Sequence, residues 1–217
     1  MADVLSGLEF SKEVGRKMYA GITHASWIIV IGLTMVITGL LHLNSVFDGW
    51  DARNFQYIHI RLRRFSRFFR YIRPLGTVPV GILLIMIIYI ASWQAGIIAT
   101  LTYILSAIIE RTIKMTIQRP RPFVTLSNVK IGQLSEPLDP SHPSGDTLRV
   151  WLLALIFPLA FTLSWPAFAI SILIAITLSL GRIVLGVHYP LDVIGGAGLG
   201  IFSAGIAMIS YQLIVIN

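Results

Sequence analysis

The feature that most constrains the fold is a series of six apolar runs spread along the whole chain. Each run approaches the roughly 20 residues that an α-helix needs to cross the hydrocarbon core of a bilayer. Inside lipid a chain must satisfy its backbone hydrogen bonds internally, which excludes open sheets. The sequence therefore predicts an all-α bundle of six transmembrane helices, over residues Gly21–Leu41, Thr77–Trp93, Ala95–Glu110, Thr147–Trp165, Pro166–Gly186 and Asp192–Ile216.

Composition supports a membrane protein, because 55% of the residues are hydrophobic and only 12% are charged, whereas a soluble domain carries about 25% charged residues. We therefore expect one integral membrane domain over residues 1–217, with no soluble module. The absence of cysteine excludes disulfides and thiolate metal sites. A net charge of +7 favours anionic lipid or a phosphate-bearing substrate as partner before nucleic acid. The sequence gives no indication of the oligomeric state.

The segment Asp48–Arg73, between the first two expected spans, has a helical periodicity of its own. Five apolar residues recur at the spacing of one helical face, and six arginines occupy much of the rest. This pattern predicts an interfacial amphipathic helix with a cationic face. The helix is either a spacer on the membrane surface or a device that gathers anionic lipid substrate. The apolar face comprises Ile58, Leu62, Phe65, Phe69 and Ile72, and the arginines are Arg61, Arg63, Arg64, Arg67, Arg70 and Arg73.

The end of the fifth run carries a cation, a potential nucleophile and a carboxylate within the string GRIVLGVHYPLD, residues 181–192. Arg182 can neutralise phosphate oxygens with its planar fork of donors. His188 can attack phosphorus or accept a proton. Asp192 follows four residues later, one helical turn, so we expect its carboxylate to orient the imidazole. Charges at the edge of a membrane are costly and usually functional.

A second cluster, KMTIQRPRP, follows the third run, on the face of the membrane where six spans also place His188. Lys114 and Arg121 are seven residues apart, and Arg119 offers a second guanidinium fork. Pro120 and Pro122 prevent a continuing helix, so Lys114 is expected near a helix end and the arginines on extended chain. By itself this cluster is equally a group of cations favoured by the dipole at a helix C-terminus.

A third cluster, SHPSGDT, opens the fourth run at residues 141–147. A Pro-Ser-Gly turn at a helix N-terminus exposes backbone N–H groups, here of Ser144 and Gly145, where an anion binds well. Taken alone, the cluster is also explained as ordinary N-capping by Ser144 or Asp146.

Together, in order and spacing, the three clusters resemble the signature of the type 2 phosphatidic acid phosphatase family, which reads K-x6-RP, P-S-G-H and S-R-x5-H-x3-D. The first part is intact, Asp146 replaces the histidine of the second, and Gly181 replaces the leading serine of the third. The resemblance covers the third to the sixth span. It implies a phosphatase that needs no metal or other cofactor, in which His188 forms a phosphohistidine and Asp192 orients it. It further implies that Lys114, Arg121, Arg182 and the backbone of Ser144 and Gly145 hold the phosphate.

The family's histidine at position 146 is expected to protonate the leaving group, which makes Asp146 the main departure. A helix N-terminus and nearby cations favour the ionised form of an aspartate, a poor acid. Three explanations stay open. His142 supplies the proton instead, or the leaving group is itself a phosphate and needs little help, or the chain is a weakened relative. The second explanation favours a lipid diphosphate. Gly181 should cost about one hydrogen bond, ~1 kcal/mol.

These features lead to one function and two competitors. The expected function is a multi-pass lipid phosphatase of the plasma (inner) membrane, with a polyprenyl diphosphate as the first candidate among lipid diphosphates and monophosphates. The competitors are a lipid phosphotransferase of the same fold and a silent lipid-phosphate-binding protein. The family's site normally faces away from the cytosol, and we expect that here. The positive-inside rule points the other way, because only Lys12, Arg16 and Lys17 lie on the opposite side.

Overall fold

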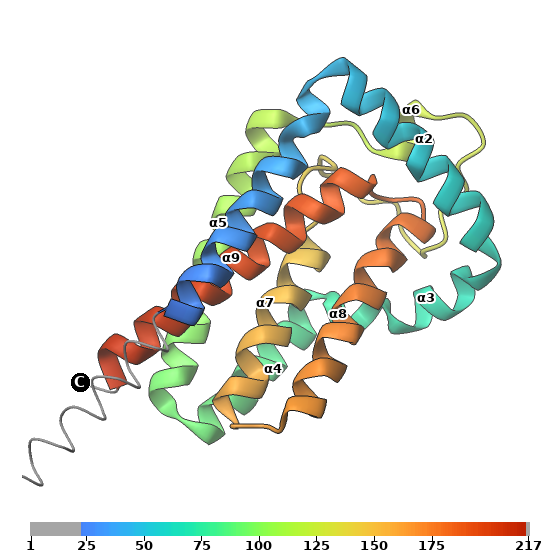
Figure 1. Cartoon of the computed structure of the whole chain (residues 1–217). Coiled ribbons are helices and arrows are strands. Elements are labelled where there is room, and N and C mark those ends of the chain that lie inside the picture. The colour runs from blue at the N-terminus through green and yellow to red at the C-terminus, as the bar shows by residue number, and fades with distance from the viewer. Residues whose placement is uncertain (1–22, 216–217) are drawn as a thin grey trace, which may run out of the picture.

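Every regular element in the described part of the chain, residues 23–215 of a computed structural model, is a helix (Figure 1). The predicted all-α class is therefore confirmed. Residue Gly21, where the first span was expected to begin, lies outside the described residues. The elements are a first helix Thr23–Leu43 ending in the 3-10 turn η1 (Leu40–Leu43), then α2 (Ser45–Leu62), η2 (Arg63–Phe65), α3 (Ser66–Ile72), η3 (Arg73–Gly76), α4 (Val78–Ala91), α5 (Trp93–Ile117), α6 (Pro122–Thr125), α7 (Gly145–Ala160), α8 (Trp165–Val184) and α9 (Pro190–Val215).

Judged by helix length and hydropathy, the described part of the chain has fewer candidate membrane spans than the six that the apolar runs predict. Within residues 23–215, four helices are long and apolar enough to cross a bilayer, namely Thr23–Leu43, Trp93–Thr125, Trp165–Val184 and Pro190–Ile214. A fifth follows if Ser45–Gly76 and Val78–Ala91, which meet at a bend of 48°, count as one span. Because α4 has 14 residues and α7 has 16, each is shorter than a bilayer core. Six spans remain a prediction.

Helix α9 runs through the bundle between α7 and the first helix (Figure 1). Its glycines allow the close approach. Gly196 faces the backbone of Ser144, the N-cap of α7, and a Cβ built on Gly39 would lie 2.6 Å from the Cα of Gly195. Small residues at such contacts let helix backbones pack closely, which stabilises helix pairs in lipid. This packing fixes the start of α9 against the start of α7, where the sequence places two of its three polar clusters.

The arginine-rich segment is not the single helix that its periodicity predicts. The chain breaks at η2 into α2 and α3, and Phe65, expected on the buried face, is 44% exposed. The fully buried residues of α2 are Asp51, Phe55 and His59, which the apolar periodicity did not mark. These side chains pack on the bundle, with Phe55 against Tyr189 and His59 bonded to the carbonyl of Val184. Four residues of the predicted apolar face, Ile58, Leu62, Phe69 and Ile72, pack on the bundle as well, and the interfacial helix remains a prediction.

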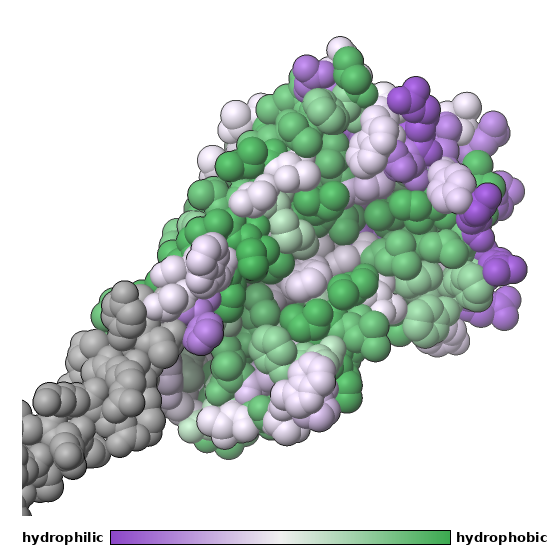
Figure 2. Space-filling model, viewed as in Figure 1, coloured by the Kyte–Doolittle hydropathy of each residue, from purple (hydrophilic) through white to green (hydrophobic). Residues whose placement is uncertain are grey.

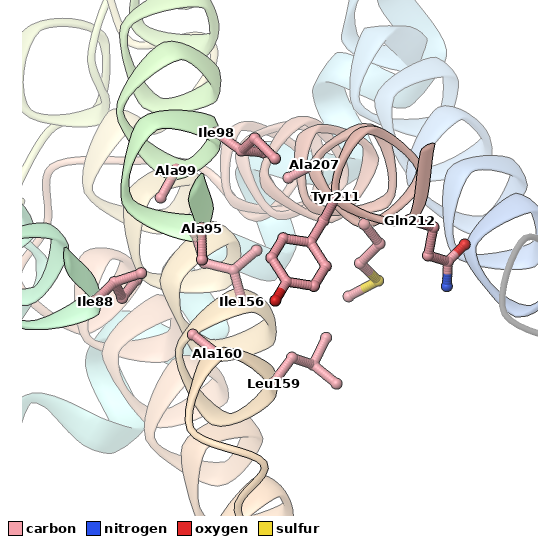
Figure 3. Close-up of a pocket in the computed structure, with 11 residues that line it drawn as sticks. Ile88, Ala95, Ile98, Ala99, Ile156, Leu159, Ala160, Ala207, Tyr211 and Gln212 are labelled. Atoms are coloured by element: carbon pink, nitrogen blue, oxygen red, sulfur yellow. The ribbon is translucent and has the colours of Figure 1, made fainter. Parts of the chain in front are cut away.

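The surface separates an apolar flank from a hydrophilic end. Figure 2 shows hydrophobic residues covering most of the visible flank of the bundle, while hydrophilic residues gather at the end that α2 and α3 cover. At the opposite end lies a cavity of about 260 Å³ with mostly apolar walls (Figure 3). One of its lining residues, Met208, is roughly 27 Å along α9 from Pro190, at 1.5 Å per residue. The cavity therefore lies far from the polar clusters of the sequence.

Candidate active site

His188 lies in the turn between α8 and α9, and its side chain is almost fully buried. Its Nδ1 is 3.7 Å from Oδ2 of Asp192, and its Nε2 is 3.3 Å from Nη1 of Arg121. Burial lowers the pKa of His188 to about 3, with Asp192 opposing the shift and the charges of Arg121 and Arg182 adding to it. The resting imidazole is therefore neutral, the form whose free electron pair can attack phosphorus.

The pairing of His188 with Asp192 was expected, but its geometry is not the helical face that the spacing suggested. Helix α9 begins at Pro190, so His188 lies outside it. Asp192 is the third residue of the helix, and its Oδ2 accepts a hydrogen bond of 2.9 Å from the backbone N–H of Tyr189. This is the reach-back half of a capping box, with proline at the first helical position. The cap holds the carboxylate beside the imidazole.

Asp192 is fully buried at the centre of a network of polar side chains. Its Oδ1 accepts from Nη1 of Arg119 at 2.7 Å, and its Oδ2 accepts from the hydroxyl of Ser141. Arg119 also pairs with Asp48 at 2.7 Å and with Asp51 at 2.9 Å, both on α2. Arg119 is thus committed to carboxylates and does not serve as a second phosphate fork. No motif in the sequence marks Asp51 for this pairing.

Lys114 and Arg121, seven residues apart, meet on one carboxylate. Helix α5 extends to Ile117, so Lys114 lies on its last turn, and Gln118 ends the helix in a left-handed conformation. Nζ of Lys114 donates to Oδ2 of Asp139, while Nη2 of Arg121 donates to Oδ1 at 2.8 Å. Burial raises the pKa of Asp139, but the hydrogen bond and charge of Lys114, with those of Arg121, outweigh it and lower that pKa to about 2. Asp139 therefore occupies two cations that were expected to hold phosphate.

Arg182, the third predicted phosphate ligand, pairs with Asp146. Its Nη1 lies 3.1 Å from Oδ2 of Asp146, whose Oδ1 accepts from Arg149 at 2.6 Å. Asp146 also lies 3.9 Å from Nε of Arg73, at the start of η3. A carboxylate engaged by guanidinium groups as an acceptor has no proton to give, which agrees with the expectation that Asp146 is a poor acid.

The turn at the start of α7 departs in part from its expected role. The N–H of Ser144 donates to the carbonyl of Asp192 at 3.0 Å, and its hydroxyl accepts from Thr147 at 2.9 Å. The Ser144 N–H is therefore already engaged. A Cβ at Gly145 would lie 2.6 Å from Oε1 of Glu110, so any larger residue here would displace that carboxylate. Glu110 also pairs with Lys114 at 2.9 Å. Glu110 therefore contacts both Lys114 and the start of α7, although no sequence motif marks it.

His142, the alternative proton donor, lies on the far side of Asp192 from the phosphate cations. Its Nδ1 is 3.4 Å from Oδ1 of Asp192, and its ring packs against His42 with centroids 4.4 Å apart. The side chain is 2% exposed. His142 has no hydrogen bond or ion pair with the cations that surround Asp139 and Asp146 among the contacts of residues 23–215. This position makes it a neighbour of the orienting carboxylate and gives no support to a role as acid.

The three polar clusters thus meet at one end of the bundle, as the resemblance implied. Two ionic groups can be distinguished there. The carboxylate network, Arg119 with Asp48, Asp51 and Asp192, lies on the Nδ1 side of His188. The cation network lies on the Nε2 side of the same ring. The roles of the individual residues remain predictions. The cation network consists of Lys114, Arg121, Arg149, Arg182 and Arg73 with the carboxylates Glu110, Asp139 and Asp146.

Comparison with known families gives one match to a family model, that of the PAP2 superfamily, over residues 92–215, more than half of the chain. Two curated relatives are similar in sequence. The bacitracin transport permease protein BcrC of Bacillus licheniformis is 32% identical over 109 residues, 50% of this chain and 51% of that one. An undecaprenyl-diphosphatase of Sulfolobus acidocaldarius is 29% identical over 144 residues, 66% of each chain. The chain thus spans about half of the first relative and just under two thirds of the second.

Two solved structures share the architecture. The crystal structure of a transmembrane PAP2 type phosphatidylglycerolphosphate phosphatase from Bacillus subtilis superposes with a TM-score of 0.72 over 86% of this chain and 96% of that one, at 18% identity. At that identity the likeness concerns the fold alone. Aquifex aeolicus LpxE superposes with a TM-score of 0.64 over 73% of this chain and 94% of that one, at 30% identity.

Proposed function

The chain belongs to the PAP2 superfamily, and on that premise we propose that it is an integral membrane lipid phosphatase that works through a phosphohistidine on His188. One observation carries the proposal. Nε2 of a buried, neutral His188 lies 3.3 Å from Arg121, which shares the carboxylate of Asp139 with Lys114. A neutral imidazole nitrogen carries a free electron pair. Beside two cations it is suited to attack a phosphate whose oxygens those cations neutralise.

In the first step, the electron pair of Nε2 forms a bond to phosphorus while the bond from phosphorus to the leaving oxygen breaks. The leaving oxygen keeps the electron pair of the broken bond. The proton stays on Nδ1, where Asp192, 3.7 Å away, stabilises the positive imidazolium. Arg121, Lys114 and Arg182 neutralise the non-bridging oxygens, and we propose that they do so without a metal.

In the second step, a water oxygen attacks phosphorus and the N–P bond breaks, which returns the electron pair to Nε2. The water proton leaves with solvent or phosphate, so neutral His188 is regenerated. Transfer to an acceptor lipid in place of water would make the protein a phosphotransferase, and the assay below separates the two.

The preferred substrate is a lipid diphosphate, with a polyprenyl diphosphate as the first candidate. Asp146 accepts a hydrogen bond from Arg149 and forms an ion pair with Arg182 but supplies no proton, so a leaving group that needs none is favoured. A phosphate group has its second pKa near 6, whereas an alkoxide needs protonation as it leaves. The sequence similarity to an undecaprenyl-diphosphatase supports the same choice. We propose that the site faces the extracytoplasmic side of the plasma membrane.

The test is phosphate release by the full chain in detergent, in the presence of a chelator, from a polyprenyl diphosphate and from the matching monophosphate. We expect the diphosphate to be hydrolysed faster. His188→Ala should abolish release and Asp192→Asn should reduce it strongly, with folding checked by thermal unfolding. Label moving to an acceptor lipid would identify a phosphotransferase. Tight binding without turnover would identify a silent lipid-phosphate-binding protein, and normal turnover by His188→Ala would refute the mechanism.

A further inference from the structure

Two arginines outside the three sequence motifs lie beside the predicted phosphate ligands. Arg149, on the second turn of α7, pairs with Asp146 at 2.6 Å and lies 3.7 Å from Glu110. Arg73, where α3 passes into η3, approaches Asp146 at 3.9 Å, a distance too long for a hydrogen bond. Neither residue is needed to explain the reaction at His188, so their presence in the cation network calls for a separate account.

Polar atoms around Asp146 remain without hydrogen-bond partners although they are buried. They are Nε of Arg73, Nε of Arg182 and Oδ2 of Asp146. The Arg182 residue is only 6% exposed. Buried donors without an acceptor are costly and are rare in folded proteins. Both unpartnered guanidinium donors would be satisfied by the oxygens of an anion bound between them.

The charge balance of the cation network also favours an additional anion. Five cationic side chains face three carboxylates, so two positive charges are left unbalanced within this group. A single phosphoryl group at neutral pH carries between one and two negative charges. Lys114 and Arg121 belong to the part of the network beside Asp139, whereas Arg73 and Arg149 belong to the part beside Asp146. Arg182, which acts on both His188 and Asp146, joins the two parts.

The arginines beside Asp146 lie next to apolar walls of the bundle. Arg149 is about one helical turn further along α7 than Gly145, at 1.5 Å per residue, and so further into the bundle. Its Nε donates to the carbonyl of Gly76, just before α4 begins. A narrow cleft next to Asp146 joins Arg73 and Arg182 to apolar walls from α3 and α8, which include Phe69, Ile72 and Leu178.

We infer that Arg73 and Arg149, together with Arg182, bind the phosphate that stays on the lipid when a lipid diphosphate is cleaved. This subsite rests on the proposed lipid phosphatase function and assigns its substrate class to named residues. When His188 takes the terminal phosphoryl group, the bridging oxygen keeps the electron pair, and the new charge develops on a phosphate beside two guanidinium groups. Cations then perform the task that a proton donor performs for an alkoxide. Asp146 holds these arginines in place before the substrate binds.

The test compares two soluble anions that occupy one or both subsites. Binding of inorganic phosphate and of methylenediphosphonate, which cannot be hydrolysed at its bridge, is measured by calorimetry on the full chain in detergent. We expect the wild type to bind the diphosphonate at least about tenfold more tightly. Arg73→Gln and Arg149→Gln should each weaken the diphosphonate about tenfold and leave phosphate binding within about threefold. The control, Arg67→Gln on the exposed part of α3, should change neither.

Retained phosphate binding also shows that a variant is folded. Because the side chain of Arg73 is 31% exposed, Arg73→Gln should disturb the structure less than Arg149→Gln. Equal binding of the two anions by the wild type would overturn the subsite, as would equal losses for both anions in both variants. Lipid turnover separates this inference from the proposed function. If the wild type hydrolyses no lipid but the binding difference holds, the function fails and the subsite stands. If both variants hydrolyse mono- and diphosphate lipids with equal losses, the subsite fails and the function stands.

Discussion

Arg119 and Arg121 are separated by a single proline, yet they serve opposite sides of His188. Arg119 pairs with Asp192, Asp48 and Asp51, whereas Arg121 pairs with Asp139 and contacts His188 directly. Regular extended chain would place residues two apart on the same side, so the division comes from the partners that surround each arginine. The sequence marks Arg121 as a phosphate ligand and offers Arg119 as a second fork, and only their surroundings distinguish the arginine that pairs with Asp192 from the one that contacts His188.

Asp139 is predicted to compete with phosphate for Lys114 and Arg121. Replacing it with asparagine removes the negative charge while keeping a hydrogen-bond acceptor, so both cations become more available. Because this carboxylate is about a third exposed, we expect a modest effect, an inhibition constant for inorganic phosphate lowered about fivefold. Inhibition of lipid hydrolysis measures it, with Glu136→Gln in the same loop as a control. Weaker inhibition would mean that Asp139 positions the two cations and does not compete with the substrate.

His188 is predicted to remain neutral well below the usual range of histidine. A pKa lowered to about 3 means that the folded protein protonates this imidazole only near that pH, whereas an unfolded chain does so near 6.5. Nitrogen-15 NMR of histidine-labelled protein in detergent should show the His188 imidazole as neutral down to about pH 4. The signal should disappear in His188→Gln. A signal lost in that variant but titrating near pH 6.5 in the wild type would contradict the prediction.

The packing of α3 on α8 explains why glycine replaces the family's serine at position 181. A Cβ on Gly181 would lie 2.8 Å from Cδ1 of Phe69, which is buried in the contact between these helices. The sequence could only predict that a hydroxyl donor was lost. The structure adds that the glycine allows α3, and with it Arg73, to approach the site.

Restoring the serine is therefore predicted to harm the protein. Gly181→Ser should force Phe69 to move and cost about 1–3 kcal/mol of stability, the usual penalty for overpacking a core. Thermal unfolding in detergent measures the loss. Gly49→Ser provides a matched control, because a Cβ at Gly49 has no neighbour within 4 Å. An unchanged unfolding temperature together with higher phosphatase activity would show that the hydroxyl matters more than the contact.

The molecule as a whole has a polar end, which holds the candidate site, and an apolar flank and opposite end (Figures 1 and 2). This polarity allows the orientation in the membrane to be measured directly. The chain has no cysteine, so single-cysteine variants can be labelled without background. Leu138 is fully exposed in the loop before Asp139, and Ser164 is exposed between α7 and α8.

We predict that a membrane-impermeant maleimide labels Leu138→Cys in intact cells and labels Ser164→Cys only after the cells are opened. This result would agree with an extracytoplasmic site and would set the positive-inside argument aside. The opposite pattern would place the site in the cytosol. Because neither residue belongs to the ionic networks, phosphatase activity of both variants should equal that of the wild type, which serves as the control for folding.

The sequence by itself determined the class of fold and the identity of the main polar residues. Apolar runs near bilayer length allow only helices, because backbone hydrogen bonds must be satisfied locally. The spacing of Lys114, Arg121, Arg182, His188 and Asp192 was enough to predict that they gather at one end. Prolines at 120 and 122 correctly predicted the end of α5 before the arginines. These conclusions rest on local rules, which a one-dimensional pattern contains.

The tertiary structure alone decided the partners of each charge. Asp51, Glu110 and Asp139 carry no motif, and they pair with cations from segments distant in sequence or, for Glu110, one turn away on a buried face. The periodicity of the arginine-rich segment predicted the apolar residues that pack on the bundle, Phe65 excepted, but not the buried Asp51 and His59. Ion pairs depend on which side chains packing brings within about 4 Å, and on burial that makes an unpaired charge costly. Neither quantity can be read from the order of residues along the chain.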